Sequence, residues 1–178
     1  GAVPTLQTDA GEILTENAVI LQYLAENAKS TQLLPPPDNF KHYRVLEWLN
    51  YITTELHKSF GPLFHPVFPE DIKEKIIIPM LKTKFNYVNQ SLEKNQPFLL
   101  GEFFTLPDAY LFVMIRWAEH FKFDLQQWPN LSRFFEEIKK SISTKITKSL
   151  PKDSVRYIYI GAMYVNFKKI LELCMIIL

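Results

Sequence analysis

Hydrophobic and polar residues recur with a helical period over most of the chain. Between residues 39 and 60, apolar side chains return every three or four positions, at Val45, Leu49, Ile52, Leu56 and Phe60. This spacing places them on one face of a helix and predicts a buried stripe. Helical patterns follow at about residues 69–94, from Phe104 and from Trp128. Residues 39–141 are therefore predicted to form an all-helical domain.

The first thirty residues have a different pattern. Residues 3–8 and 12–15 are short extended segments joined by Asp9-Ala10-Gly11, which predicts a β-hairpin. Residues 16–28 predict an amphipathic helix with Thr15 as its N-cap. Because two strands alone are not stable in water, the hairpin must pack on other elements. Residues 1–30 are thus a unit of their own, and the proline-rich segment 31–38 predicts a stiff linker at a domain boundary.

Prolines and a polar pair indicate where helices of the second domain begin and bend. Thr105 and Asp108 stand three residues apart before an apolar run, the spacing of a capping box with Asp in place of the usual Glu. Pro107 then falls in the first turn, where proline is tolerated. Pro79 is expected to kink or restart the 69–94 helix, because proline lacks the N–H that an interior turn needs.

The segment 142–178 lacks the pattern of the preceding helices. Its second half is crowded with aliphatic and aromatic residues, but charges at Arg156, Lys168, Lys169 and Glu172 interrupt it. It is not predicted to span a membrane. We expect an atypical tail after the helical domain.

Net charge, the cysteine count and the spacing of the histidines exclude several kinds of partner and site for this protein. The 178-residue chain has a formal net charge of +1, which predicts no nucleic-acid or membrane partner. Its single cysteine, Cys174, excludes an intramolecular disulfide and is typical of the cytoplasm. The four histidines show no metal-ligand spacing, so no metal site is predicted.

The chain starts without a signal peptide or an initiator Met, inside a predicted strand, and is interpreted as a fragment.

One polar row stands out in the stretch WLNYITTELHKSF, residues 48–60. At about 100° per residue, Asn50, Thr54 and His57 lie within roughly a 60° arc of a helix. A solvated face is more often Lys and Glu. The row has two interpretations: it lines a ligand site, or its histidine is satisfied within a helical bundle.

Three stretches together resemble the bacterial beta-class glutathione S-transferases. They are VPTLQTDAGEILTENAVILQYLAE, WLNYITTELHKSF and GEFFTLPDAYLFVMIRWAEH, and the likeness runs from Gly1 to about Lys140. It implies a mainly α fold. An all-helical C-terminal domain is preceded by the second half, hairpin plus helix, of a thioredoxin-like α/β domain. It also implies a homodimer that binds glutathione.

The resemblance assigns glutathione contacts to the first domain. The Val3–Pro4 bond is expected to be cis, which turns the Val3 backbone toward the peptide ligand; an ordinary edge-strand proline is the alternative. Glu16 is expected to take the ligand's ammonium group, and Asn17, with the helix N-terminus, its γ-glutamyl carboxylate. The alternative for Glu16 is a capping acid without a ligand. The family usually has Ser or Gly at the position of Asn17.

The resemblance also interprets the polar row. His57 is expected to face the glutathione sulfur, where an imidazole favours the thiolate. Lys58 is expected to add positive potential there. Asn50 and Thr54 are expected to touch glutathione along the subunit boundary. The implied reaction is conjugation of glutathione, a co-substrate, to small hydrophobic electrophiles in detoxification, without a metal or other cofactor.

The chain departs from the family in two places. The first βαβ of the thioredoxin-like domain, with the active-site cysteine, is not in the sequence, and Cys174 is not its equivalent. The family's closing helix is not recognisable in residues 142–178. This chain is therefore expected to be weak or inactive as a transferase. The alternatives are a catalytically silent remnant and a helical protein-binding module.

Overall fold

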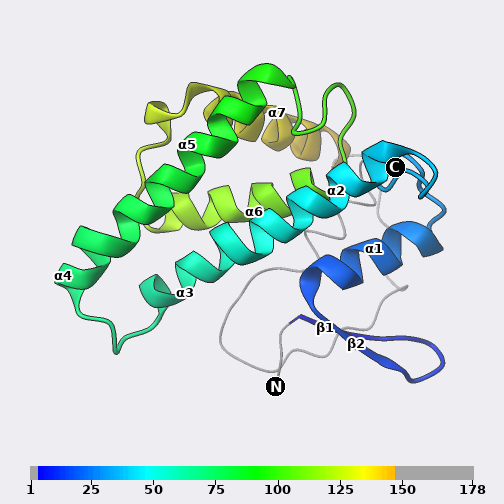
Figure 1. Cartoon of the computed structure of the whole chain (residues 1–178), viewed down its shortest axis with the longest axis horizontal. Helices are drawn as coiled ribbons and strands as arrows, with labels where there is room; N and C mark the ends of the chain where they lie inside the picture. Colours follow the sequence, from blue (N-terminus) through cyan, green and yellow to red (C-terminus); the bar gives the residue numbers. More distant parts are fainter. Residues whose placement is uncertain (1–3, 147–178) are drawn as a thin grey trace.

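The computed structural model describes residues 4–146 and shows a bundle of helices with a small hairpin at one side (Figure 1). Its elements, in chain order, are β1 (Thr5–Gln7), β2 (Ile13–Thr15), α1 (Asn17–Asn27), α2 (Phe40–Tyr51), η1 (Ile52–His57), α3 (Lys58–Phe64), α4 (Glu70–Ile72), η2 (Lys73–Ile77), α5 (Ile78–Lys94), α6 (Leu106–His120), η3 (Leu125–Gln127) and α7 (Pro129–Ile146). The predicted fold class, helical with a preceding hairpin and helix, is confirmed.

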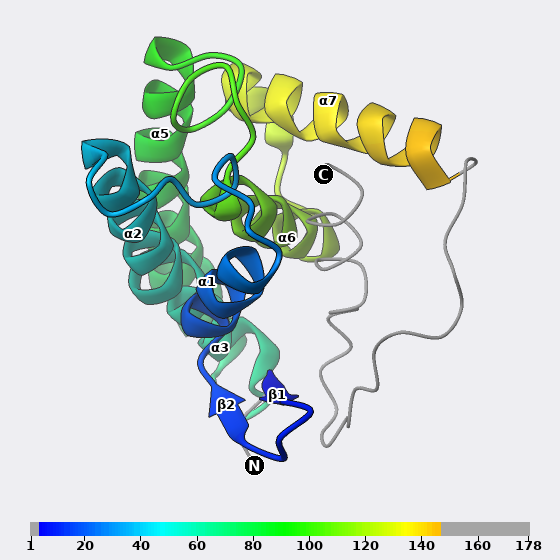
Figure 2. The same ribbon diagram turned by 90° about the vertical axis from the view of Figure 1, so that its right-hand side faces the viewer.

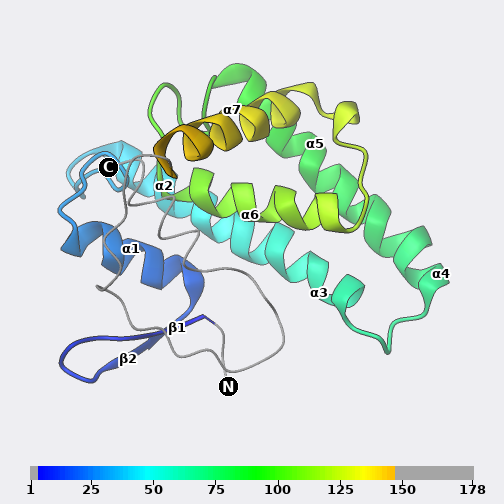
Figure 3. The same ribbon diagram turned by 180° about the vertical axis from the view of Figure 1, so that it is seen from behind.

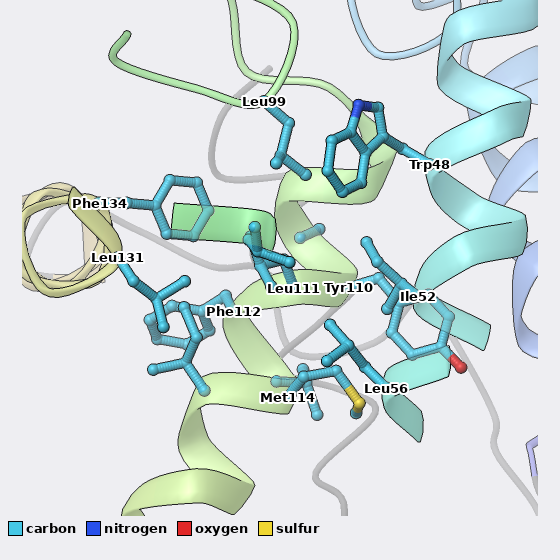
Figure 4. Packing of buried hydrophobic residues seen from close by; sticks show 14 of the residues in the cluster. Trp48, Ile52, Leu56, Leu99, Tyr110, Leu111, Phe112, Met114, Leu131 and Phe134 are labelled. Carbon is cyan, nitrogen blue, oxygen red and sulfur yellow. The ribbon is translucent and has the colours of Figure 1, made fainter. Parts of the chain in front are cut away.

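Helix α6 is the centre of the bundle. Every residue from Leu106 to Ile115 is buried. In Figure 4, α6 side chains pack between Ile52 and Leu56 on one side and Leu131 and Phe134 on the other. The stripe predicted for residues 39–60 is confirmed, since all five of its apolar side chains are at most 1% exposed. A helix that is apolar all round belongs in a core, and α6 is placed accordingly.

The capping box predicted at the start of α6 is present. The Asp108 carboxylate accepts hydrogen bonds from the backbone N–H and the hydroxyl of Thr105, both at 2.8 Å. It also accepts one from the backbone N–H of Leu99 at 2.9 Å. Asp108 is fully buried, so these donors replace water for a charged group.

The predicted hairpin is confirmed as an antiparallel pair with Leu6 opposite Leu14. Its turn closes through a 2.9 Å hydrogen bond from the Gly11 N–H to the Thr8 carbonyl oxygen. Gly11 has a φ of 85°, which glycine adopts without strain. Helix α1 contacts both strands and also α6, so it joins the hairpin to the bundle (Figure 2).

The proline-rich segment is docked on the core. Leu33 and Leu34 are buried, and the Leu33 carbonyl oxygen accepts a 3.1 Å hydrogen bond from the Leu106 N–H. One hydrophobic cluster contains Leu21 of α1, both leucines and the helical bundle. Two leucines directly before the three prolines thus connect the packing on either side, and the stiff linker at a domain boundary stays a prediction.

Two predicted helices are interrupted by π-helical turns. The rod over residues 39–60 is α2, then η1, then α3, and these follow one another without a break (Figure 3). Similarly, η2 comes directly before α5, whose first turn contains Pro79. Hydrogen bonds of the i→i+5 kind insert an extra residue into the turn, a feature that sequence periodicity does not reveal. The π-helical turn η2 ends at Ile77 and the α-helix α5 begins at Ile78, so the restart expected at Pro79 is a change from π-helix to α-helix.

Helix α7 runs to Ile146, past the expected end of the helical domain at residue 141. Val3 and the tail segment 147–178, which contains Cys174, lie outside the described residues. Among the helices of residues 4–146, none is long and apolar enough to cross a membrane.

Candidate functional site

His57 is the last residue of η1, and its side chain contacts α6. Its Nδ1 lies 2.5 Å from the Tyr110 hydroxyl oxygen. Its ring also meets Trp117 edge to face, with centroids 4.8 Å apart and an interplanar angle of 76°. Tyr110 and Trp117 stand two turns apart on one face of α6. The imidazole is thus held from two directions by rigid helical neighbours.

The surroundings of His57 favour the uncharged imidazole. Burial lowers its pKa from 6.5, and the opposing influence of the Glu16 carboxylate is smaller. The start of α1 is therefore within electrostatic reach of His57. A neutral imidazole has one N–H donor and one bare nitrogen, which suits it to orient a polar hydrogen.

Tyr110 keeps its phenolic proton. Burial raises its pKa to about 12, the side chains of Thr53 and Asn17 lower it, and Glu16 raises it. The hydroxyl is therefore surrounded by groups from η1 and α1. These two elements are far apart in the sequence, and α6 connects them.

Glu16 has a strained backbone at the junction of β2 and α1. Its φ and ψ are 71° and 112°, values that a residue with a side chain rarely adopts. Such strain costs about 1–3 kcal/mol and occurs mainly at functional sites. Glu16, not Thr15, is the N-cap: Thr15 is still paired in β2, so the prediction for Thr15 was wrong. The Glu16 side chain makes no capping bond and is exposed.

Asn17 is buried, and neither polar atom of its side-chain amide has a hydrogen-bond partner among the described residues. The amide is close enough to Tyr110 to lower the pKa of the phenol, although it does not reach hydrogen-bond geometry. The structure therefore directs this side chain toward the interior. The glutathione contact of Asn17 stays a prediction, and the backbone N–H groups of the first turn of α1 are further donors there.

Comparisons with known proteins agree with this arrangement. A family model described as "Glutathione S-transferase, C-terminal domain" matches residues 51–141. Over 138 residues the chain is 43% identical to the glutathione S-transferase GstA of Escherichia coli O157:H7, covering 78% of this chain and 68% of that protein. It is 32% identical to the glutathione S-transferase GST-4.5 of Xanthomonas campestris, over 78% and 70% of the two chains. The chain belongs to the glutathione S-transferase family.

Solved structures place this glutathione S-transferase in the bacterial beta class. A beta-class enzyme from Sphingomonas chungbukensis aligns with a TM-score of 0.72 at 33% identity, covering 78% of this chain and 68% of that one. A glutathione transferase from Methylococcus capsulatus aligns with a TM-score of 0.75 at 42% identity, over 79% and 68% of the chains. The resemblance read from the sequence is confirmed.

The polar row does not keep the arrangement expected for a continuous α-helix. His57 is half-buried against α6, whereas Asn50, Thr54 and Lys58 are exposed. The Thr54 hydroxyl donates to the Asn50 carbonyl oxygen at 3.1 Å. The π-helical turn over residues 52–57 changes the angle per residue, so the arc computed at 100° does not apply. The glutathione contacts of Asn50 and Thr54 stay predictions.

Pro4 stands at the start of the hairpin and is half-buried. The Val3–Pro4 peptide bond includes a residue outside the described range, so its predicted cis form is not described. Within residues 4–146, no cluster of three or more His, Cys, Asp or Glu could hold a metal ion.

Sequence reasoning missed the partners of His57 in this transferase. Neither Tyr110, Trp117 nor Thr53 was predicted to lie beside the imidazole. One signal was available: a phenol in a helix that is otherwise apolar needs a hydrogen-bond partner once it is buried. The pattern alone does not say that the partner is His57.

A separate depression lies away from this site. It has a volume of about 540 Å³ and is lined by residues of the proline-rich segment, the start of α2 and the loop before α6, among them Thr31, Pro36, Lys41 and Phe103. It contains none of the residues around His57, so it is not part of the candidate site.

Proposed function

We propose that this protein conjugates the thiol of glutathione to small hydrophobic electrophiles, as in detoxification. Family membership supports the reaction class. The observation that supports the site most directly is that α6 contacts both elements that carry it: its Tyr110 hydroxyl bonds to His57, and α1 packs against the same helix. One end of glutathione would bind at the start of α1 while its sulfur lies beside the imidazole.

The residues at the start of α1 suit the polar end of the tripeptide. The first backbone N–H groups of the helix attract the γ-glutamyl carboxylate, and the helix dipole adds to this attraction. The exposed Glu16 carboxylate is available for the ammonium group. The strained Glu16 backbone supports this assignment, because such strain occurs mainly at functional sites.

The chemistry needs only glutathione as nucleophile, with no metal. Its thiol releases a proton to water, and the thiolate attacks an electrophilic carbon. A C–S bond forms as the leaving group departs with its electron pair. His57 stabilises the thiolate by donating an N–H, and the exposed Lys58 ammonium adds positive potential nearby.

The test uses the 178-residue chain on glutathione resin and with a chlorodinitrobenzene-type electrophile. Retention on the resin together with turnover is the expected result, even if turnover is weak. Retention without turnover would indicate a silent remnant of the family. Failure of both, with a protein partner captured in a pull-down, would favour a binding module. Either of these last two results overturns the proposed reaction.

A homodimer is the proposed assembly, with the face of α2 and α5 as its interface. Trp48 stacks on Tyr87 with centroids 5.7 Å apart, and Tyr51 lies 5.0 Å from Tyr87. On the same two helices, Tyr43 and Met80 are 54% and 47% exposed. A cluster of exposed aromatic and apolar side chains is typical of a protein interface.

The substitution Tyr87→Glu should convert a dimer into a monomer, because it places a charge in the apolar centre of this face. Sedimentation velocity measures the mass of both forms. Tyr23→Glu, at a partly exposed tyrosine of α1, is the matched control and should stay dimeric. A Tyr87→Glu protein that sediments like wild type would place the interface elsewhere.

The cytoplasm is the proposed location, supported by the single cysteine of the chain. Recovery of the protein from a membrane or periplasmic fraction of cells would contradict it.

A further inference from the structure

The hydrogen bond between Tyr110 and His57 is not used by the reaction as proposed above. It joins a residue of α6 to one of η1 that is 53 positions away in the sequence. Tyr110 is 2% exposed, and its ring meets the imidazole at 80° with centroids 5.7 Å apart. A tyrosine that only filled space would need no such contact, since phenylalanine fills the same volume.

The direction of this hydrogen bond follows from the acidities of the two groups. A phenol O–H is a stronger donor than the N–H of a neutral imidazole, and the bare imidazole nitrogen is a strong acceptor. The phenol keeps its proton because burial raises its pKa to about 12, and burial lowers the pKa of His57. The O–H therefore donates to Nδ1, which leaves the imidazole proton on Nε2.

The groups around Tyr110 are compatible with a phenol O–H that donates to His57. The Thr53 hydroxyl donates to the Leu49 carbonyl oxygen at 2.7 Å, so its own proton is occupied. The Asn17 amide is buried close to the phenol, and both its NH₂ and its oxygen lack a partner; of these described neighbours, His57 is the one that reaches hydrogen-bond geometry with the phenol. If that NH₂ moves to donate to the phenol oxygen, the O–H still points to Nδ1.

We propose that Tyr110 is a positioning residue that holds His57 as the Nε2–H tautomer, so that the imidazole presents an N–H donor to the glutathione thiolate. This inference rests on the proposed function for its consequence in catalysis. The tautomer itself does not depend on that function. Tyr110 acts through His57 and does not touch the reacting atoms.

The two ring nitrogens of His57 then have different roles. Nδ1 is used for orientation, because its bond to Tyr110 fixes the ring against Trp117. Nε2 is left to act on the ligand. An imidazole free to exchange tautomers would present an acceptor for part of the time, and an acceptor repels a thiolate.

The test compares Tyr110→Phe with Tyr51→Phe in the 178-residue chain. Tyr51 is the matched control: burial raises its pKa to about 12 as well, but its hydroxyl donates to the Lys84 carbonyl oxygen and not to His57. Nitrogen NMR of the imidazole reports which nitrogen carries the proton. The signal of His57 is assigned by its loss in His57→Asn, which leaves the other three histidines in place.

The wild type and Tyr51→Phe should show His57 protonated on Nε2 alone, with Nδ1 accepting a hydrogen bond. Tyr110→Phe should show both tautomers, and its kcat should fall about fivefold with little change in KM for glutathione, as expected for the loss of one neutral hydrogen bond. Thermal unfolding should be similar for the two Phe variants.

Wild-type His57 carrying its proton on Nδ1, or occurring as a mixture of tautomers, overturns the inference even if Tyr110→Phe does not fold. An unchanged tautomer in a folded Tyr110→Phe protein overturns it too. Absence of conjugation by the wild type would overturn the proposed function, while the tautomer measurement would still decide the role of Tyr110.

Discussion

His57→Asn should lower kcat/KM for conjugation by about 10- to 100-fold while leaving the fold intact. The Asn side chain reaches about as far as Nδ1, so it can still accept the Tyr110 hydrogen bond. It has no atom at the position of Nε2, so the donor to the thiolate is lost, and removal of one such donor typically has an effect of this size. Steady-state kinetics with glutathione and a chlorodinitrobenzene-type electrophile measure it, and the free energy of unfolding should fall by only about 1 kcal/mol.

Two further variants make the His57 result specific. His57→Gln places an amide near the Nε2 position and should retain more activity than His57→Asn. His42→Asn is the matched control, because His42 also has its Nδ1 bonded, at 2.8 Å from the Pro35 carbonyl oxygen, but lies outside the site. It should turn over like wild type. An unchanged rate in His57→Asn would reduce His57 to a packing residue.

Asp108→Ala should destabilise the protein by about 3 kcal/mol. It removes the capping box of α6 and leaves the N–H groups of Leu99 and Thr105 buried without partners. Urea unfolding followed by circular dichroism gives the difference. The matched control is Asp124→Ala, which removes the cap of η3 at an exposed position and should cost less than about 1 kcal/mol. Equal effects of the two substitutions would show that burial of the Asp108 network contributes nothing.

The buried Asp108 carboxyl group also predicts that the free energy of unfolding depends on pH. Burial raises the pKa of Asp108 from 3.8 to about 6, against the lowering effect of its hydrogen bonds. A carboxyl group with a raised pKa in the folded state stabilises the fold most below pH 3.8, and this contribution is lost as the pH rises through about 6. Relative to Asp108→Asn, the wild type should therefore gain about 1 kcal/mol of unfolding free energy between pH 7 and pH 5. A constant difference between the two proteins would contradict the raised pKa.

Much of the fold could be predicted because its signals are local. The hairpin turn at Gly11, the buried stripe that includes Ile52 and Leu56, and the Thr105–Asp108 cap all depend on residues within one or two turns of each other. His57 was found for the same reason, since it breaks the pattern of its own helix. Such features follow from chain geometry and side-chain chemistry and need no knowledge of distant contacts.

Two departures from the local expectations share one physical cause. The cap of α1 was assigned to Thr15 by its side-chain chemistry, but pairing with Thr5 keeps Thr15 in β2 and moves the turn to a strained Glu16. The polar row was computed for an α-helix, but packing against α6 is accompanied by a π-helical turn that takes His57 inward. In both cases a contact outside the local segment overrode a local preference.

By itself, the sequence determined the helices, the cap of α6, the buried faces and the candidate imidazole. Tertiary structure alone decided that Tyr110 bonds to His57, that the Asn17 amide faces the interior and that the proline-rich segment joins the core. The reason is that a side chain's own sequence neighbours set its secondary structure, while its charge state and hydrogen bonds are set by whatever the fold brings beside it. For His57 that neighbour is 53 residues away.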